Sequence, residues 1–125
     1  MTLRPYTNLD YWTLASWWNT HKWPCPDQEM LPKTGFIVEE ICAGFLYKTD
    51  SKIAWLEFII SNPVSDKQER NKALDLLIKK LCEEAKNCEF AAVFTSTEHE
   101  KLIQRYTDHG FKITDNNMKN MVKRI

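Results

Sequence analysis

The stretch from Trp55 to Ala85 contains the residue pattern in this chain that is best suited to chemistry. It begins as an apolar strand, passes through a polar turn and continues as an amphipathic helix. The N-terminus of an open helix carries unpaired backbone N–H groups and about half a positive charge. A pyrophosphate can bind at such a turn with few dedicated side chains, so the turn is a candidate anion site.

The position at which this helix begins decides whether the anion site exists. If the helix opens near Asn71, its first amides are free, and Arg70 and Lys72 add positive charge beside them. The run Ser65-Asp66-Lys67-Gln68 also fits a capping box, in which Ser65 caps the helix and Gln68 reaches back to the Ser65 N–H. Arg70 and Asn71 would then lie inside the first turns with their amides already bonded. The residues alone leave both starts open.

Glu57 lies on the strand before this turn, between large apolar side chains. Alternation along the strand places it on one face with Trp55 and Ile59. Burial raises the pKa of a carboxyl group toward the range in which it can accept a proton from an ammonium group, directly or through a water, as a general base does. A solvated Glu at a sheet edge fits the pattern equally well, because a single acidic residue in a strand is not diagnostic.

The hydrophobic pattern also predicts the elements that position these residues. A short strand at Leu3 to Tyr6 precedes a tryptophan-rich helix, which is capped by Asn8 or Asp10 and runs from Tyr11 to about residue 21. A loop with three prolines follows, in which residues 27–31 can form a helical turn. We then expect three antiparallel strands, at residues 36–39, 41–47 and 53–60.

The second half of the chain alternates helices with strands. After Pro63, apolar residues recur with helical spacing on one face, at Leu74, Leu77, Ile78, Leu81, Cys82 and Ala85. A strand at residues 90–94, a helix at 98–109 ended by Gly110, and a hairpin of residues 111–114 and 118–123 complete the prediction. The expected fold is a single α/β domain over residues 1–125, with a mixed, mostly antiparallel twisted sheet flanked by about four helices.

This order of elements and two short motifs resemble the GNAT family of acetyl-CoA-dependent N-acetyltransferases over nearly the whole chain. The segment from Gln68 to Ala73, QERNKA, is similar to the family's (Arg/Gln)-x-x-Gly-x-(Gly/Ala) pyrophosphate loop and matches its first and last positions. Asn71 replaces the central Gly, which lets a ligand approach the backbone closely, and Asn is among the best tolerated substitutes there. In the second motif, Tyr106 precedes Gly110-Phe111 by four residues, as a helical Tyr does in the family.

The resemblance implies a role for each of these positions. Tyr106 corresponds to the phenol that donates a proton to the departing CoA thiolate, which suits a pKa of about 10 beside a leaving thiol of about 8.5. Glu57 is similar by position to the general base of several members. The resemblance favours the helix that opens near Asn71, and it places acetyl-CoA against the backbone of Ile59, Ile60 and Ser61 and against Gln68, Arg70, Asn71, Lys72 and Ala73.

Tryptophans near the N-terminus indicate where an acceptor could bind. The four tryptophans near the N-terminus cannot all face one core, because Trp17 and Trp18 point about 100° apart on a helix; they are Trp12, Trp17, Trp18 and Trp23. With His21, Trp23 and the proline-rich loop, they occupy the region that contacts the acceptor in similar proteins, and aromatic rings can bind a cationic amine. Packing in a core or an interface is the simpler interpretation of these rings. The same opening, Trp17-Trp18 with His21, resembles small phage-encoded acetyltransferase-like proteins.

Composition limits the remaining classes of function. The 17 Lys and Arg balance the 17 Asp and Glu, so no overall charge attracts the chain to nucleic acid or to an anionic membrane. The four cysteines form no CxxC or Cys/His cluster, and we expect reduced thiols and no metal site. The N-terminus lacks a secretory signal pattern and no apolar run approaches membrane-spanning length, which predicts a cytoplasmic protein.

The sequence therefore predicts an acetyl-CoA-dependent N-acetyltransferase with an amine acceptor, either a small molecule or a protein. Glu57 is the expected base, Tyr106 the acid, and attack is direct because no Cys stands in a nucleophile motif.

Asn71 departs from the family pattern, as does His99, which stands where the family often has Asn. A GNAT-like domain without catalysis, which binds a protein or a ligand, is therefore an alternative. A third is an α/β module unrelated to CoA, with its helix capped at Ser65. The chain allows a homodimer without indicating one.

Overall fold

One five-stranded sheet forms the centre of the protein, and its strands lie in the order in which they occur in the chain. The computed structural model describes all 125 residues. Neighbouring strands are antiparallel from β1 to β4, whereas β4 and β5 are parallel because a helix connects them. The predicted mixed, mostly antiparallel sheet is confirmed, with strands β1 (Leu3–Pro5), β2 (Gly35–Val38), β3 (Cys42–Lys48), β4 (Ile53–Ser61) and β5 (Ala92–Phe94).

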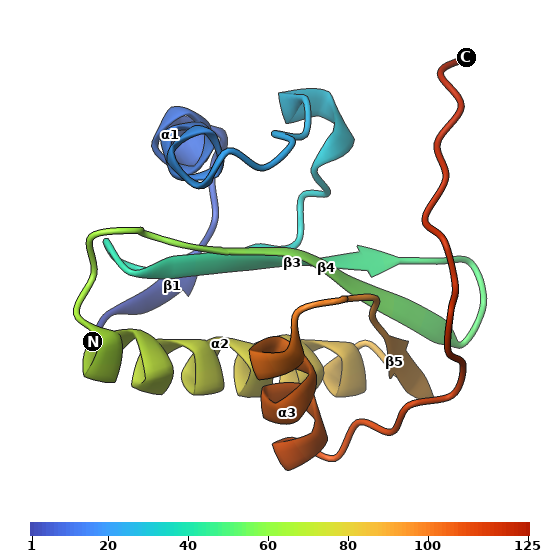
Figure 1. Ribbon diagram of the computed structural model, residues 1–125. Coiled ribbons are helices and arrows are strands. Elements are labelled where there is room, and N and C mark those ends of the chain that lie inside the picture. The colour runs from blue at the N-terminus through green and yellow to red at the C-terminus, as the bar shows by residue number, and fades with distance from the viewer.

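Helices cover both faces of the sheet (Figure 1). α1 (Tyr11–His21) lies on one face, and α2 (Lys67–Asn87) and α3 (Glu100–Asp108) lie on the other. The segment predicted as a helical turn forms only a short 3-10 helix, Gln28–Met30, because prolines on both sides prevent a longer helix. The α/β class is confirmed with three α-helices rather than about four. No helix combines the length and the apolarity that crossing a membrane requires.

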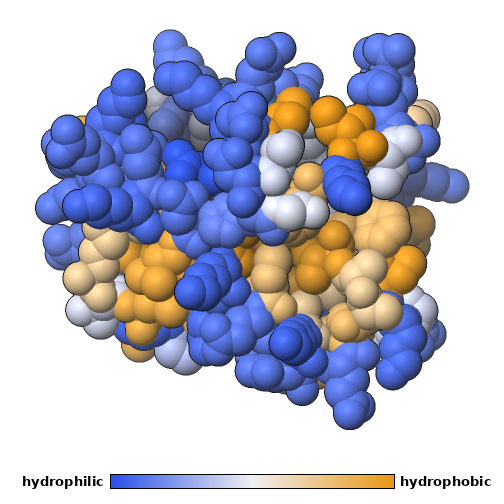
Figure 2. All heavy atoms as spheres, turned by 90° about the horizontal axis from the view of Figure 1, so that it is seen from below, coloured by the Kyte–Doolittle hydropathy of each residue, from blue (hydrophilic) through white to orange (hydrophobic).

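Two apolar cores lie on the two faces of the sheet. On the α1 face, Trp17 and Trp18 pack with Leu14 of the same helix and with Phe45 of β3. On the opposite face, the predicted apolar stripe of α2 packs on β2, β3 and β4, and its buried members are Ala73, Leu77, Ile78, Leu81 and Ala85. The outer surface on this side is mostly hydrophilic, with apolar side chains gathered in separate patches (Figure 2).

The close packing of α2 on the sheet requires the glycine at position 44 of β3. A Cβ atom at Gly44 would lie 3.1 Å from atoms of Ile59 and Leu81 and 3.2 Å from an atom of Leu77. Such separations are shorter than ordinary van der Waals contact, so a side chain at position 44 would force its neighbours, two of them on α2, to shift by a few tenths of an ångström. Gly44 therefore keeps α2 close beneath the part of β4 that contains Ile59.

α3 holds Tyr106 against the core. Gly110, two residues after the end of α3, stops the helix with a φ of 93°, in the region that favours glycine. The N–H of Phe111 then donates to the carbonyl of Tyr106 at 3.0 Å, and the two rings lie with their centroids 5.0 Å apart. Tyr106 is only 4% exposed as a result. The predicted helix is confirmed, although it is shorter than 98–109 at both ends.

The C-terminal segment differs from the prediction. Residues 112–125 form no strand and run from α3 along the side of the molecule toward the α1 face (Figure 1), so the predicted hairpin is wrong. An exposed ion pair between Arg124 and Asp27, 3.3 Å apart, connects the segment to the loop after α1. A hairpin is marginal unless it pairs with a sheet, and β5, which starts at Ala92 rather than at Phe90, offers an edge of only three residues.

α2 begins at Lys67, earlier than the resemblance favours. The carboxylate of Asp66 accepts a hydrogen bond from the N–H of Glu69 at 3.0 Å and is the N-cap. The N–H of Arg70 donates to the carbonyl of Asp66 at 2.8 Å, so the backbone amides are bonded from Arg70 onward. The predicted opening near Asn71 is therefore wrong.

The alternative start is correct except for the identity of the cap. Asp66 caps the helix in place of Ser65, because the Ser65 hydroxyl instead donates to the carbonyl of Asn62 at 2.7 Å. Asp and Ser are about equally good N-caps, so sequence preference could not separate them. The turn before α2 is thus tied to Asn62, and the helix closes early.

Loss of this cap should destabilise the protein. We expect Asp66→Ala to lower the free energy of unfolding by about 1 kcal/mol, because the N–H of Glu69 loses its acceptor at the helix start. Urea unfolding followed by circular dichroism measures the change. Ser65→Ala is the matched variant and should cost less. A larger loss for Ser65→Ala than for Asp66→Ala would contradict the assigned cap.

Candidate active site

β5 pairs along its whole length, but only with the first three residues of β4. β5 pairs with Ile53, Ala54 and Trp55, and it ends at Phe94, whereas β4 continues to Ser61. Beyond this point, the hydroxyl of Thr95 donates to the carbonyl of Leu56 at 2.6 Å. The second half of β4 therefore has a strand neighbour only on its β3 side.

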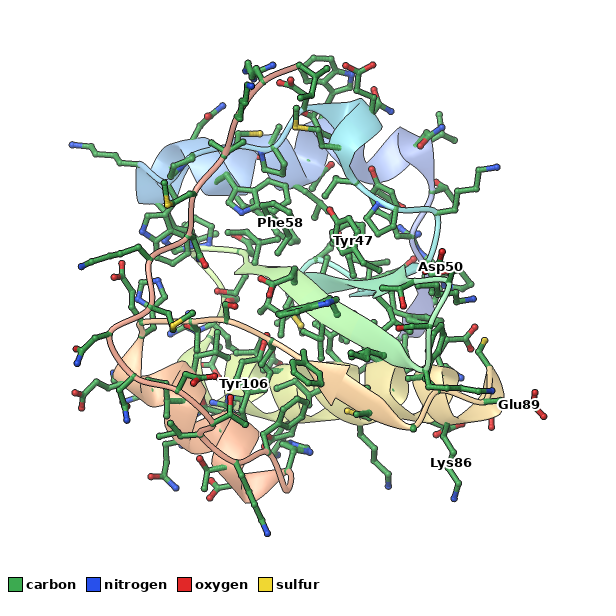
Figure 3. All side chains as sticks on the ribbon, turned by 90° about the vertical axis from the view of Figure 1, so that its right-hand side faces the viewer. Tyr47, Asp50, Phe58, Lys86, Glu89 and Tyr106 are labelled. Atoms are coloured by element: carbon green, nitrogen blue, oxygen red, sulfur yellow. The ribbon has the colours of Figure 1, made fainter.

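A β-bulge lies in the same part of β4. Phe45 pairs with Glu57 and Ala43 pairs with Ile60, so β4 has one residue more than β3 in this interval. Phe58 takes up the extra residue with a φ of 57°, a left-handed conformation that is strained for a large side chain. Its ring lies on the α1 face, where it contacts Tyr47 and Trp18 (Figure 3). The bulge places Phe58 on the same face as its neighbour Glu57.

Glu57 is held at the end of the β5 pairing. Its Oε1 accepts a hydrogen bond from the N–H of Ser96 at 3.0 Å. Burial raises the pKa of the Glu57 carboxyl to about 7, and the Ser96 bond opposes this only in part. A carboxyl group with a pKa near neutrality can exchange a proton with an amine at physiological pH, which is the property of a general base.

Tyr106 approaches the same place from the other face of the sheet, on α3 (Figure 3). Burial raises the pKa of its phenol well above the usual value, and the negative charge of Glu57 adds to the rise, while a polar contact with Thr95 opposes it. Tyr106 therefore keeps its proton at neutral pH. A proton acceptor and a proton donor thus lie around the end of β5, and both line one groove of about 1780 Å³.

The groove is positively charged. Its lining contains three carboxylates, those of Glu57, Glu98 and Asp115, and six Lys or Arg side chains, contributed by α2, α3 and the C-terminal segment: Lys67, Arg70, Lys101, Arg105, Lys112 and Lys119. Such an excess attracts an anionic ligand and raises its local concentration. The backbone N–H groups of Lys67 and Gln68, at the start of α2, have no acceptor within the protein and are available to an anion.

Arg105 connects α3 to α2 inside this groove. Its guanidinium donates to the carbonyl of Asn71 at 3.1 Å and to the Asn71 side-chain oxygen at 2.9 Å. It also forms an ion pair with Asp75 at 2.9 Å, and His109 Nε2 lies 3.0 Å from the same carboxylate. Asn71, the residue in place of the family's Gly, therefore binds another helix of the protein.

Solved acetyltransferases share this architecture, although no protein-family model and no curated protein sequence matches the chain. A putative acetyltransferase from Agrobacterium tumefaciens aligns with a TM-score of 0.69 and 13% identity, over 99% of this chain and 100% of its own. An N-acetyltransferase from Staphylococcus aureus aligns with a TM-score of 0.69 and 11% identity, over 89% of this chain and 82% of its own. The Mycobacterium tuberculosis protein Rv2747, solved in complex with CoA, aligns with a TM-score of 0.74 and 13% identity, over 95% of this chain and 76% of its own.

The chain has the GNAT fold. Within this fold, the sequence resemblance placed CoA along the second half of β4 and the start of the following helix. Of the positions it implied for CoA, Ile59, Ser61, Arg70 and Asn71 line the groove. Ile60 and Ala73 are buried in the two cores, and Gln68 and Lys72 lie outside the groove lining. The segment from Gln68 to Ala73, which resembles the GNAT pyrophosphate motif, is therefore helical in this chain, and only part of it faces the groove.

The residues that were predicted to contact the amine acceptor also lie partly inside and partly outside the groove lining. Trp18 and Trp23 line the groove and Trp17 does not, although Trp17 and Trp18 both belong to the core beneath α1. His21 Nε2 donates to the carbonyl of Ser61 at 3.0 Å, and its ring stacks on Trp23 with centroids 4.3 Å apart. His21 thus attaches the end of α1 to the end of β4.

Sequence reasoning missed several residues of this groove. Trp55 and Phe94 line it beside Glu57, and Ser96 holds the Glu57 carboxylate through its backbone. Trp55 could have been predicted as a groove residue, because it lies two residues before Glu57 and therefore on the same face of the strand. No pattern in the sequence indicates Arg105, because its partner Asn71 lies 34 residues away.

The raised pKa of Glu57 should appear in the pH dependence of stability. Between the ordinary value of 4.5 and about 7, the folded protein binds more protons at Glu57 than the unfolded chain does, so the free energy of unfolding falls as pH rises through this window. Glu57→Gln removes the loss. Urea unfolding of both proteins at several pH values should give a difference that changes within the window and is constant on either side. Parallel curves throughout would show that the carboxyl group is not desolvated.

Proposed function

We propose that this protein is an acetyl-CoA-dependent N-acetyltransferase that transfers the acetyl group to a primary amine by direct attack. The observation that carries the proposal is the position of Glu57 and Tyr106 in one groove, around the end of β5. One group accepts a proton near neutral pH and the other retains one. These are the two proton transfers that aminolysis of a thioester requires.

The positive groove fits the anionic part of CoA. Lys67 and Arg70 lie at the start of α2, next to the unpaired amides of Lys67 and Gln68. Charge-assisted hydrogen bonds from these groups would hold the pyrophosphate. The pantetheine arm would lie along the second half of β4, at Ile59 and Ser61, where β5 leaves that side of the strand without a neighbour. Bound acetyl-CoA supplies an acyl thioester at the end of this arm.

The proposed residues balance the reaction. The acceptor reacts as the free amine, so a bound ammonium first gives one proton to solvent by way of the Glu57 carboxylate. As the amine nitrogen bonds to the acyl carbon, Glu57 accepts the second proton that the nitrogen loses. Tyr106 donates its proton to the sulfur as the C–S bond breaks, the products are an amide and free CoA, and proton exchange with solvent returns Glu57 and Tyr106 to their starting states. Burial raises the pKa of the Cys82 thiol in the same groove, and burial of the CoA sulfur would likewise make it a better acceptor for the Tyr106 proton.

Direct attack is favoured over an acyl-enzyme. Cys82 is the cysteine that lines the groove, and the rise in its pKa keeps it as a thiol, which is a poor nucleophile. An acceptor amine that reaches Glu57 therefore needs no covalent carrier.

A binding module without catalysis is a second candidate, and one observation favours it. Arg105 occupies both oxygen atoms of Asn71, at the position where the family's loop approaches its ligand. If this contact persists, a ligand has only the amides at the very start of α2. The two candidates differ in whether the groove binds acetyl-CoA and releases free thiol from it.

Calorimetric titration tests the CoA site. We expect acetyl-CoA to bind, and Lys67→Ala to weaken binding by about tenfold, equal to about 1.4 kcal/mol, because the variant removes a charge that faces the groove. Lys72→Ala is the matched control, an exposed Lys on the same helix that lies outside the groove lining, and it should have no effect. No heat at millimolar acetyl-CoA would remove the enzyme proposal, and equal effects of the two variants would relocate the site.

The chemical roles are tested by thiol release from acetyl-CoA in the presence of amines. Glu57→Gln and Tyr106→Phe should each lower kcat by about 10²–10⁴-fold, the usual contribution of a general base or acid. The wild-type rate should show a break near pH 7, rising as Glu57 ionises, and Glu57→Gln should lack this break. Unchanged rates and pH profiles in both variants would disprove these assignments while leaving the CoA site intact.

A further inference from the structure

Four aromatic rings surround Glu57 on the α1 face of the sheet. Tyr47, Trp55 and Phe94 form one row across β3, β4 and β5, because Trp55 pairs with Tyr47 on one side and with Phe94 on the other. Phe58 joins them through the bulge, and its ring contacts that of Tyr47. We call these four residues the aromatic floor. Glu57 lies two residues along β4 from Trp55, on the same face.

The aromatic floor is open to solvent although it is part of a packed sheet. α1 covers the neighbouring ring of Phe45, which is fully buried, and through Trp18 it contacts Phe58 at one end of the floor. Trp55 is 37% exposed, and Phe58 and Phe94 are 39% exposed each. Large apolar rings gathered around one carboxylate are costly to leave in water, and such a patch is typical of a binding site.

The charges near the floor fit a ligand with a single positive charge. Glu57 is the carboxylate that lies among the rings, whereas the other two in the groove come from the residue before the N-cap of α3 and from the C-terminal segment. The groove as a whole has six Lys or Arg side chains against these three. A ligand with several ammonium groups would find one partner and meet an excess of like charge.

The spacing of ring and carboxylate sets the shape of such a ligand. Two residues along a strand span about 7 Å, so a ring stacked on Trp55 lies one short linker away from Glu57. Offset or edge-to-face contacts with Trp55 and Phe94, whose own centroids lie 5.2 Å apart, favour a flat aromatic body over a branched aliphatic one.

We propose that the acceptor is an arylalkylamine: a primary amine with one positive charge, joined by a short linker to an aromatic ring that binds on the aromatic floor while the nitrogen faces Glu57. This inference rests on the proposed acetyl transfer for its chemistry, but the amine site exists independently of CoA. It excludes polyamines and multiply charged amino sugars as preferred acceptors.

The experiment compares three amines as acceptors: 2-phenylethylamine, n-propylamine, which lacks the ring, and spermidine, which carries several charges. We expect kcat/KM for 2-phenylethylamine to exceed that of either other amine by about tenfold or more, because only it buries a ring. Trp55→Ala should raise KM for 2-phenylethylamine by a similar factor and leave n-propylamine unchanged. Spermidine as the preferred acceptor, or equal effects of Trp55→Ala on both monoamines, would overturn the proposal.

Three further variants keep the test decisive. Trp12→Ala is the matched control, because Trp12 is 75% exposed on α1 and does not line the groove, and this variant should change no KM value. Trp55→Phe keeps a ring in a smaller side chain and should recover most of the affinity for 2-phenylethylamine. If Trp55→Ala fails to fold, Trp55→Phe and Phe94→Leu carry the comparison, and Phe94→Leu should raise KM for 2-phenylethylamine alone.

Direct binding separates this inference from the proposed function. Adding 2-phenylethylamine to the free protein should shift the NMR signal of the Trp55 indole N–H, which is assigned by its loss in Trp55→Phe, and n-propylamine should not shift it at the same concentration. If the amine binds in this way but acetyl-CoA does not, the transferase proposal fails and the amine site stands. If acetyl-CoA is turned over but the indole signal does not move, the inference fails and the transferase proposal stands.

Discussion

The parting of β4 from β5 is the constraint on which the rest of the site depends. Parallel strands hold each other only as far as both continue, and β5 ends at Phe94 while β4 has six more residues after Trp55. In that interval the polar groups of β4 need other partners, and Thr95 supplies one from the chain that leaves β5. The bulge at Phe58 lies in the same interval, where the strand is free to deviate. A sheet with a full-length β5 would have neither the groove nor a Glu57 carboxylate that lines it.

Helix stability and anion binding place opposite requirements on the backbone amides at the start of α2. A helix that closes early is more stable, because Asp66 and the first turn satisfy its amides. An anion site needs those amides open. The chain leaves only the first N–H groups unpaired and places cationic side chains around them. In the proposed CoA site, electrostatic attraction from side chains therefore has a larger share of phosphate binding than in a glycine-rich loop, where the backbone itself contacts the phosphate.

Local sequence patterns predicted most elements of the fold, but they failed where a partner distant in the chain decides the structure. The apolar period of α2, the strand alternation around Leu56 and the Gly110 stop of α3 are local signals, and each element formed close to its expected position. The start of α2 was ambiguous because the run from Ser65 to Gln68 fits a capping box, whereas the family resemblance favours an opening near Asn71. The helix starts early, and Asp66 rather than Ser65 caps it because the Ser65 hydroxyl bonds to Asn62. The hairpin after Phe111 had strand-like residues but no adequate sheet edge. Within the site, Glu57 and Tyr106 could be found from their elements, whereas the contact of Arg105 with Asn71 joins two helices and has no signature along the chain.

The contact between Arg105 and Asn71 also competes with any ligand that reaches the backbone of Asn71. Such a ligand must displace the guanidinium, so its apparent affinity is the intrinsic affinity multiplied by the fraction of molecules in which this contact is open. Asp75 holds the same guanidinium and is itself held by His109, which favours the closed contact. Binding of such a ligand and opening of the contact are therefore thermodynamically linked, and a change that weakens the contact raises the apparent affinity of the ligand without touching it.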